Sequence, residues 1–150
     1  MATACDDNIV RLFKLPANGL AAAKSFHIIR INLNNEKAQA VAFGKSAAEV
    51  IVASSGAAGG SRLAKYHVPD APGKAPELKW QVPAAHNAHD IMTLATLPGE
   101  PRGRPTAVVS CSASETNLGL WYTESGKLVE KINSNQVGRP EFDYPLREKG

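Results

Sequence analysis

Long apolar runs, cysteines and long helical patterns are scarce or missing in this 150-residue sequence. No apolar run approaches the roughly 20 residues that cross a membrane. Asp6 and Asp7 lie where a secretory signal would have basic and then apolar residues. The two cysteines, Cys5 and Cys111, are far apart, each in an apolar run, which favours reduced thiols over a disulfide framework. We therefore expect a cytoplasmic chain that is neither secreted nor inserted in a membrane.

The sequence also lacks a large excess of positive or negative charge. The chain has 17 Lys and Arg against 14 Asp and Glu, a net charge of +3. Nucleic-acid binders gather basic residues into patches, whereas the densest basic stretch here, Arg102 to Arg104, lies in a Pro/Gly-rich segment without an aromatic partner. A basic β domain that associates with RNA or another nucleic acid stays as an alternative. It depends on scattered residues: Arg11, Lys14, Arg62, Lys65, Arg102 and Arg104.

Helical periodicity is nearly absent. The one helix candidate, Asn18 to Lys24, is too short to be stable alone in water. The apolar residues instead form short runs rich in Val, Ile, Leu and aromatics, bounded by Gly, Pro, Asn, Asp and Ser. This pattern of short apolar runs bounded by turn-forming residues predicts an all-β protein of many short strands.

The short runs repeat. Three similar strands end in small residues, at 2–5, 50–55 and 107–112, and each leads into a strand with one aromatic. Those aromatics, Phe13, Tyr66 and Trp121, are 53 and 55 residues apart. A further strand follows each of them, at 25–33, 77–82 and 127–132, and another precedes the second and third copies, at 37–44 and 90–97. The repeating unit therefore has four strands.

A four-strand unit at this period is the signature of a β-propeller blade. We predict a partial blade at 1–36, full blades at 37–86 and 87–136, and an irregular tail at 137–150. The copies exceed the roughly 40–45 residues of a compact WD40 repeat, and the excess predicts surface loops at Pro16 to Ala23, Pro69 to Pro76 and Pro98 to Pro105. Because a closed propeller needs about 4–8 blades, we expect an incomplete ring and a fragment of a larger propeller.

Two segments, ACDDNIVRLFKL and SCSASETNLGLWYTESGKL, resemble the ends of repeats in the WD40 family. Phe13-Lys14 replaces the family's Trp-Asp pair, and His86 follows Ala85 where the family has Gly-His. The resemblance implies a WD40-type β-propeller segment that acts as a non-enzymatic scaffold for protein–protein interaction. It also implies structural WD-type positions, with a turn acid at Asp6 or Asp7 that Glu115 replaces imperfectly in the last copy. These positions are Asp6, Asp7, Phe13, Tyr66, His86 and Trp121.

The run GKLVEKINSNQ further resembles the transducin beta-like group within that family. This resemblance implies an association with the endoplasmic reticulum and with stress-signalling or RNA-containing complexes. The membrane anchor of that group would lie N-terminal to this chain.

Catalytic and metal-binding patterns are weak. His86, His89 and Asp90 form the one cluster with the look of metal ligands, but the flanks predict a loop that enters a strand, and a zinc site would need remote ligands. Ser110 and Ser112 flank Cys111 without a G-x-S-x-G elbow and without a His close in sequence. The sequence therefore predicts no catalytic residue, no cofactor and no metal.

Overall fold

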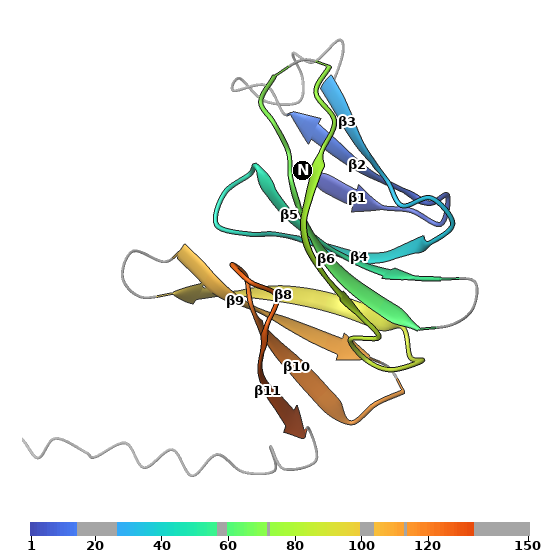
Figure 1. The fold of residues 1–150 in the computed structure, drawn as a ribbon, viewed down its shortest axis with the longest axis vertical. Helices are drawn as coiled ribbons and strands as arrows, with labels where there is room; N and C mark the ends of the chain where they lie inside the picture. The colour runs from blue at the N-terminus through green and yellow to red at the C-terminus, as the bar shows by residue number, and fades with distance from the viewer. Residues whose placement is uncertain (15–26, 57–59, 72, 100–103, 113, 134–150) are drawn as a thin grey trace, which may run out of the picture.

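The computed structural model describes residues 1–14, 27–56, 60–71, 73–99, 104–112 and 114–133. These residues form three antiparallel sheets that lie one after another in chain order (Figure 1). The helix candidate at 18–24, the loop at 16–23 and the tail at 137–150 lie outside the described residues. Within the described ranges there is no helix with the length and apolar content needed to cross a bilayer.

The first sheet has three strands, β1 (Ala2–Ala4), β2 (Ile9–Lys14) and β3 (His27–Asn32). The second has four, β4 (Lys37–Phe43), β5 (Glu49–Ser55), β6 (Ser61–His67) and β7 (Glu77–Pro83). The third also has four, β8 (Ile91–Gly99), β9 (Arg104–Ser112), β10 (Asn117–Tyr122) and β11 (Leu128–Asn133). In each sheet, strands that follow one another in sequence are neighbours. The all-β prediction of a propeller segment is confirmed, and the described sheets form no closed ring.

One apolar core lies between the first and second sheets, and another lies between the second and third sheets. Strand β5 contributes side chains to both cores. Val50 and Val52 belong to the core at the first junction, between the first and second sheets. Ile51 and Ala53 belong to the core at the second junction, between the second and third sheets. Successive side chains of a strand point to opposite faces of the sheet. A strand with an apolar core on both faces therefore has an uninterrupted run of apolar residues in its sequence. This explains the sequence VIVA at the centre of the chain.

The segment Pro98 to Pro105, expected to be a surface loop, is partly strand. Pro98 and Gly99 end β8, and Arg104 and Pro105 begin β9, with Pro98 opposite Pro105 and Gly99 opposite Arg104. The register shifts between Leu97 and Pro98, which is the kind of irregularity that accommodates a proline in a sheet. The loop prediction was therefore wrong at both ends of this segment.

Candidate functional site

His86 lies in the short segment between β7 and β8, and β6 holds its backbone. The N–H of Ala85 donates to the carbonyl oxygen of Ser61 at 3.0 Å, and the N–H of His86 donates to Ser61 Oγ at 2.7 Å. Ala84 and Asn87 have φ values of 51° and 52°, so the chain turns sharply on both sides. The imidazole, which has no exposed surface, thereby enters the second junction.

The imidazole links the β9–β10 turn to the interior of the third sheet. Its Nδ1 lies 2.7 Å from Glu115 Oε2, and its Nε2 lies 2.8 Å from Ser110 Oγ. Trp121 Nε1–H donates to the same Ser110 Oγ at 2.7 Å. A carboxylate only accepts, so His86 Nδ1–H donates to Glu115. We call His86, Ser110, Glu115 and Trp121 the His86 network.

Glu115 is the member of the His86 network nearest to solvent, with its side chain 12% exposed. Its second carboxylate oxygen accepts a hydrogen bond from Asn87 Nδ2 at 2.8 Å. Burial by itself raises the pKa of Glu115, but the hydrogen bonds from His86 and Asn87 outweigh burial and hold the pKa below its ordinary value. The carboxylate is therefore the favoured form.

We expect Glu115→Gln to make the protein less sensitive to acid. A lowered folded-state pKa adds stability above the unfolded value near 4.5, and this stability is lost as the pH falls through the folded value. The variant keeps an acceptor for His86 but cannot take up the proton, so its free energy of unfolding should fall less steeply below about pH 4.5 than that of the unchanged protein. Urea unfolding at a series of pH values measures the slope, with Glu130→Gln on the exposed part of β11 as control. Equal slopes for the unchanged protein and Glu115→Gln would contradict the assignment.

The connection Ser–His–Glu has the order of a catalytic relay, but its position does not suit catalysis. A nucleophilic serine must reach its substrate, whereas Ser110 has no exposed surface and its oxygen already accepts the Trp121 N–H. Within the described residues, no three His, Cys, Asp or Glu side chains gather in a way that could hold a metal ion. Both ring nitrogens of His86 have partners, and His89 and Asp90 do not join them. The His86 network connects the segment between β7 and β8, whose backbone is held by β6, to the third sheet.

The first junction uses a different polar set. Ser54 Oγ–H donates to Glu36 Oε2 at 2.6 Å, and Arg62 Nε–H donates to the same oxygen at 2.6 Å. Arg62 also reaches Tyr66 Oη at 3.4 Å and Gln81 Oε1 at 3.1 Å. Glu36, which directly precedes β4, therefore contacts the β5 serine much as His86, which precedes β8, contacts Ser110.

The remaining predicted positions lie apart from the His86 network. Asp6 forms an ion pair with Lys37 at 3.0 Å, and Asp7 forms one with Arg11 that lowers the pKa of Asp7. Phe13 lies at the end of β2. Of the six predicted residues, the structure brings His86 and Trp121 together, adds Ser110 and Glu115, and leaves Tyr66 at the first junction.

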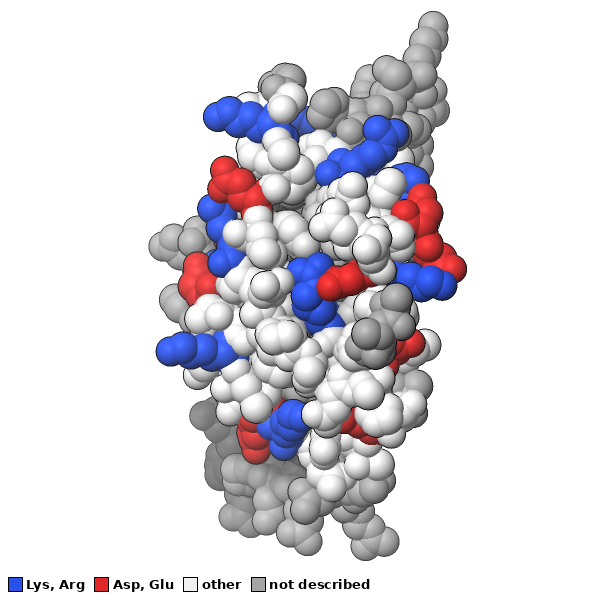
Figure 2. Space-filling view, turned by 45° about the vertical axis from the view of Figure 1, so that its right-hand side comes forward, with Lys and Arg blue, Asp and Glu red and all other residues white. Residues whose placement is uncertain are grey.

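Most basic side chains that suggested nucleic-acid binding are occupied. Figure 2 shows Lys and Arg interspersed with Asp and Glu over the face that it displays. Arg102 lies outside the described residues. Four of the six residues make ion pairs in the described part of the chain: Arg11 with Asp7, Lys14 with Asp70, Arg62 with Glu36, and Lys65 with Glu49.

The β10–β11 turn makes a second set of contacts across the second junction. Trp80 Nε1–H donates to the carbonyl oxygen of Thr123 at 3.1 Å. The Trp80 ring lies against Gly126, where an added Cβ would stand 2.6 Å from a ring carbon. Glu124 pairs with Lys45 at 2.9 Å, and this contact lowers the pKa of Glu124. We call the contact surface formed by Thr123 and Gly126 the Trp80 site.

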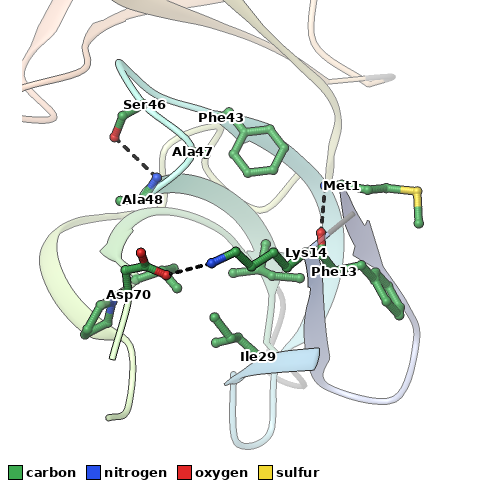
Figure 3. Close-up of a pocket in the computed structure, with 12 residues that line it drawn as sticks. Met1, Phe13, Lys14, Ile29, Phe43, Ser46, Ala47, Ala48 and Asp70 are labelled. Carbon is green, nitrogen blue, oxygen red and sulfur yellow. Dashed lines mark hydrogen bonds and ion pairs between the residues drawn. The ribbon is translucent and has the colours of Figure 1, made fainter. Parts of the chain in front are cut away.

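A cavity of about 420 Å³ opens at the first junction (Figure 3). Ile29 and Phe43 lie on its two sides, from the first and second sheets, and Val68 and Pro69 line it after β6. The Lys14–Asp70 ion pair spans it at 3.2 Å, with both side chains mostly exposed. The cavity is mainly apolar and continues the first core, to which Leu12 and Val68 belong.

Together, the successive four-stranded sheets and the polar contacts between them define a β-propeller type of fold. No protein-family model matches the chain, and no curated protein matches its sequence. Among solved structures, the chain is similar to the β-propeller domain of Cps50 (Swd1) from Myceliophteria thermophila, with a TM-score of 0.60 and 12% sequence identity. The match covers 88% of this chain and 38% of that domain, so the chain spans well under half of its length.

Proposed function

We propose that the chain is a non-enzymatic scaffold of the WD40 type that binds protein partners. An apolar surface on the third sheet supports this proposal. Five of the seven large apolar side chains that are exposed among the described residues belong to that sheet: Met92, Leu97, Tyr122, Leu128 and Val129. Consecutive residues such as Leu128 and Val129 point to opposite faces of the sheet, but Leu97 and Tyr122 share one face, and exposed apolar groups that share a face mark interaction surfaces in soluble proteins.

Leu97 and Tyr122 form this apolar surface of the third sheet. Both lie opposite Ala107 of β9, Leu97 on β8 and Tyr122 on β10, so their side chains share one face of the sheet. They are 41% and 50% exposed. Aromatic and aliphatic groups on a rigid sheet make suitable anchors for a protein partner, because little conformational entropy is lost on binding.

We expect Leu97→Lys/Tyr122→Lys to reduce partner capture by at least about tenfold, because each change puts a charge into a contact that excludes water. Leu78→Lys is the matched control, since Leu78 is 48% exposed on β7 of the second sheet. Tagged protein and quantitative mass spectrometry of captured proteins measure the effect. Equal capture by the double variant and the unchanged protein would contradict the proposal.

The same experiment separates a protein partner from nucleic acid. Protein capture should persist between about 50 mM and about 200 mM salt, whereas binding to phosphates weakens steeply over that range. It should also resist nuclease treatment. Capture that disappears under both conditions would favour the nucleic-acid alternative.

The finer resemblance, to transducin beta-like protein 2, stays a prediction. It depends on the run GKLVEKINSNQ, of which residues 126–133 are described as the turn and β11. With it we propose a cytoplasmic location with association with the endoplasmic reticulum. Fractionation of cells that express the tagged chain tests this, and a chain absent from the reticulum fraction would contradict it.

A further inference from the structure

The two junctions can be compared residue by residue. Leu12 directly precedes the repeated aromatic Phe13, and Lys65 directly precedes Tyr66. The residue opposite Leu12 on β3 is Ile29, and the residue opposite Lys65 on β7 is Trp80. Ile29 and Trp80 are both partly buried against the core that their sheet shares with the next one. They are therefore equivalent positions.

The surfaces that these two residues face are equivalent as well. Trp80 donates to the carbonyl oxygen of Thr123, two residues after Trp121. Ile29 shares the cavity with Val68, two residues after Tyr66. Thr123 and Val68 are both buried, and both follow the third strand of their sheet.

The cavity at the first junction therefore corresponds to the volume that the Trp80 indole occupies at the second. An isoleucine side chain is smaller than an indole, and a cavity of about 420 Å³ lies beside Ile29 between the sheets. This volume is within the range of pockets that bind small ligands or anchor side chains.

We infer that the cavity binds an aromatic side chain, of which tryptophan fits best, from an extended segment of a partner protein. Its ring would lie between Ile29 and Phe43, and its indole N–H would donate to the Val68 carbonyl oxygen, as Trp80 does to that of Thr123. This inference deepens the proposed scaffold function and rests on it. It assigns one anchor site, separate from the apolar surface of the third sheet, and one chemistry of partner.

The Lys14–Asp70 ion pair does not block entry. Its side chains are 70% and 92% exposed, and exposed pairs of this kind contribute little to stability. The pair can open as a ligand enters, and Lys14 then lies close enough to the cavity to interact with an aromatic ring face. Aromatic anchors gain from such a cation, and aliphatic ones do not.

N-acetyltryptophanamide tests the cavity without any partner protein. We expect it to bind the 150-residue chain at least about tenfold more tightly than N-acetylleucinamide does. Changes in the backbone NMR shifts of Ile29, Ala47 and Val68 measure the binding. Ile29→Trp fills the cavity with the chain's own indole and should abolish binding, and Ala47→Trp should block it from the exposed β4–β5 turn. Trp80→Ile is the reciprocal change and should create a second site near Gly126.

Each result bears on one proposal. Binding that Ile29→Trp or Ala47→Trp does not weaken lies elsewhere and overturns the inference, as does equal binding of the leucine compound. If the compound binds nowhere while partner capture depends on Leu97 and Tyr122, the scaffold function stands and the cavity inference falls. If the compound binds in the cavity while no protein is captured, the cavity stands as an aromatic site and the scaffold function falls.

Discussion

His86→Ala is expected to lower the free energy of unfolding by about 3 to 4 kcal/mol, the largest loss that we expect from a single change outside the strands. The change removes a fully buried ring, leaves Ser110 and Glu115 without their shared partner, and opens a void beside Trp121. Because domains of this size are stable by only about 5 to 15 kcal/mol, the midpoint of unfolding should move to a much lower urea concentration. Urea unfolding followed by circular dichroism measures the shift.

His89→Ala provides the matched control three residues away. No side-chain hydrogen bond of His89 is described, and we expect its replacement to change the free energy of unfolding by no more than about 0.5 kcal/mol. If His86→Ala does not fold, His86→Asn keeps a polar group in the site and should lie between the two. Equal stability of His86→Ala and His89→Ala would show that the His86 network contributes nothing to the sheet junction.

A double-mutant cycle separates the network from the packing of the ring. The double variant His86→Ala/Ser110→Ala should lose less free energy of unfolding than the two single variants lose in sum, by about 1 to 2 kcal/mol. The reason is that each single change already breaks the same hydrogen bond. Additive losses would mean that His86 acts only by filling space.

The sequence predicted the strands well because their signal is local. Short β-branched runs ended by Gly, Asn, Asp and Ser set the strand ends within a few residues, and the copies supported one another. Pro98 to Pro105 is the exception. Prolines and glycines in that segment indicated a loop, yet the β8–β9 hairpin extends through Pro98 and Pro105, because pairing along nine-residue strands outweighs the local preference.

The site was only partly visible in the sequence. His86 and Trp121 were found through the repeat, but Ser110 was weighed only as a nucleophile, and its role depends on packing between sheets. A signal was present in the run LGLW. Gly119 lies opposite Ser110, and a Cβ there would stand 2.5 Å from Trp121 Nε1, so only glycine lets the indole reach the serine.

The first junction shows why the rest could not be predicted. Glu36 contacts Ser54 much as His86 contacts Ser110, but the residue opposite Ser54 is Arg62, whereas the residue opposite Ser110 is Gly119. Neither Glu36 nor Arg62 matches the pattern by residue type. The similarity is visible only in the structure, where Ser54 and Ser110 are both buried and each contacts the segment that precedes the first strand of its sheet. Each junction therefore has a polar contact to a buried serine, from a carboxylate that also pairs with Arg62 at the first and from an imidazole at the second.

Gly126→Ala is expected to lower the free energy of unfolding by about 3 kcal/mol, through two effects that add. Gly126 has a φ of 67°, a left-handed conformation that costs an alanine about 1 to 2 kcal/mol. The new Cβ would also stand 2.6 Å from the Trp80 ring, so the indole must leave the Trp80 site and give up its hydrogen bond to Thr123.

Gly73→Ala separates these two effects. Gly73 has a φ of 78°, and no described atom lies within 4 Å of a Cβ added there. The free energy of unfolding of Gly73→Ala should therefore fall only by the cost of the left-handed backbone, about 1 to 2 kcal/mol. The difference between the two variants therefore measures how strongly Trp80 joins the second sheet to the third. In Gly126→Ala the Trp80 indole N–H resonance should also move toward the value of a solvent-exposed indole, while Gly73→Ala leaves it in place. Equal losses with an unmoved resonance would mean that the turn yields to the methyl group, and that Trp80 does not hold the two sheets together.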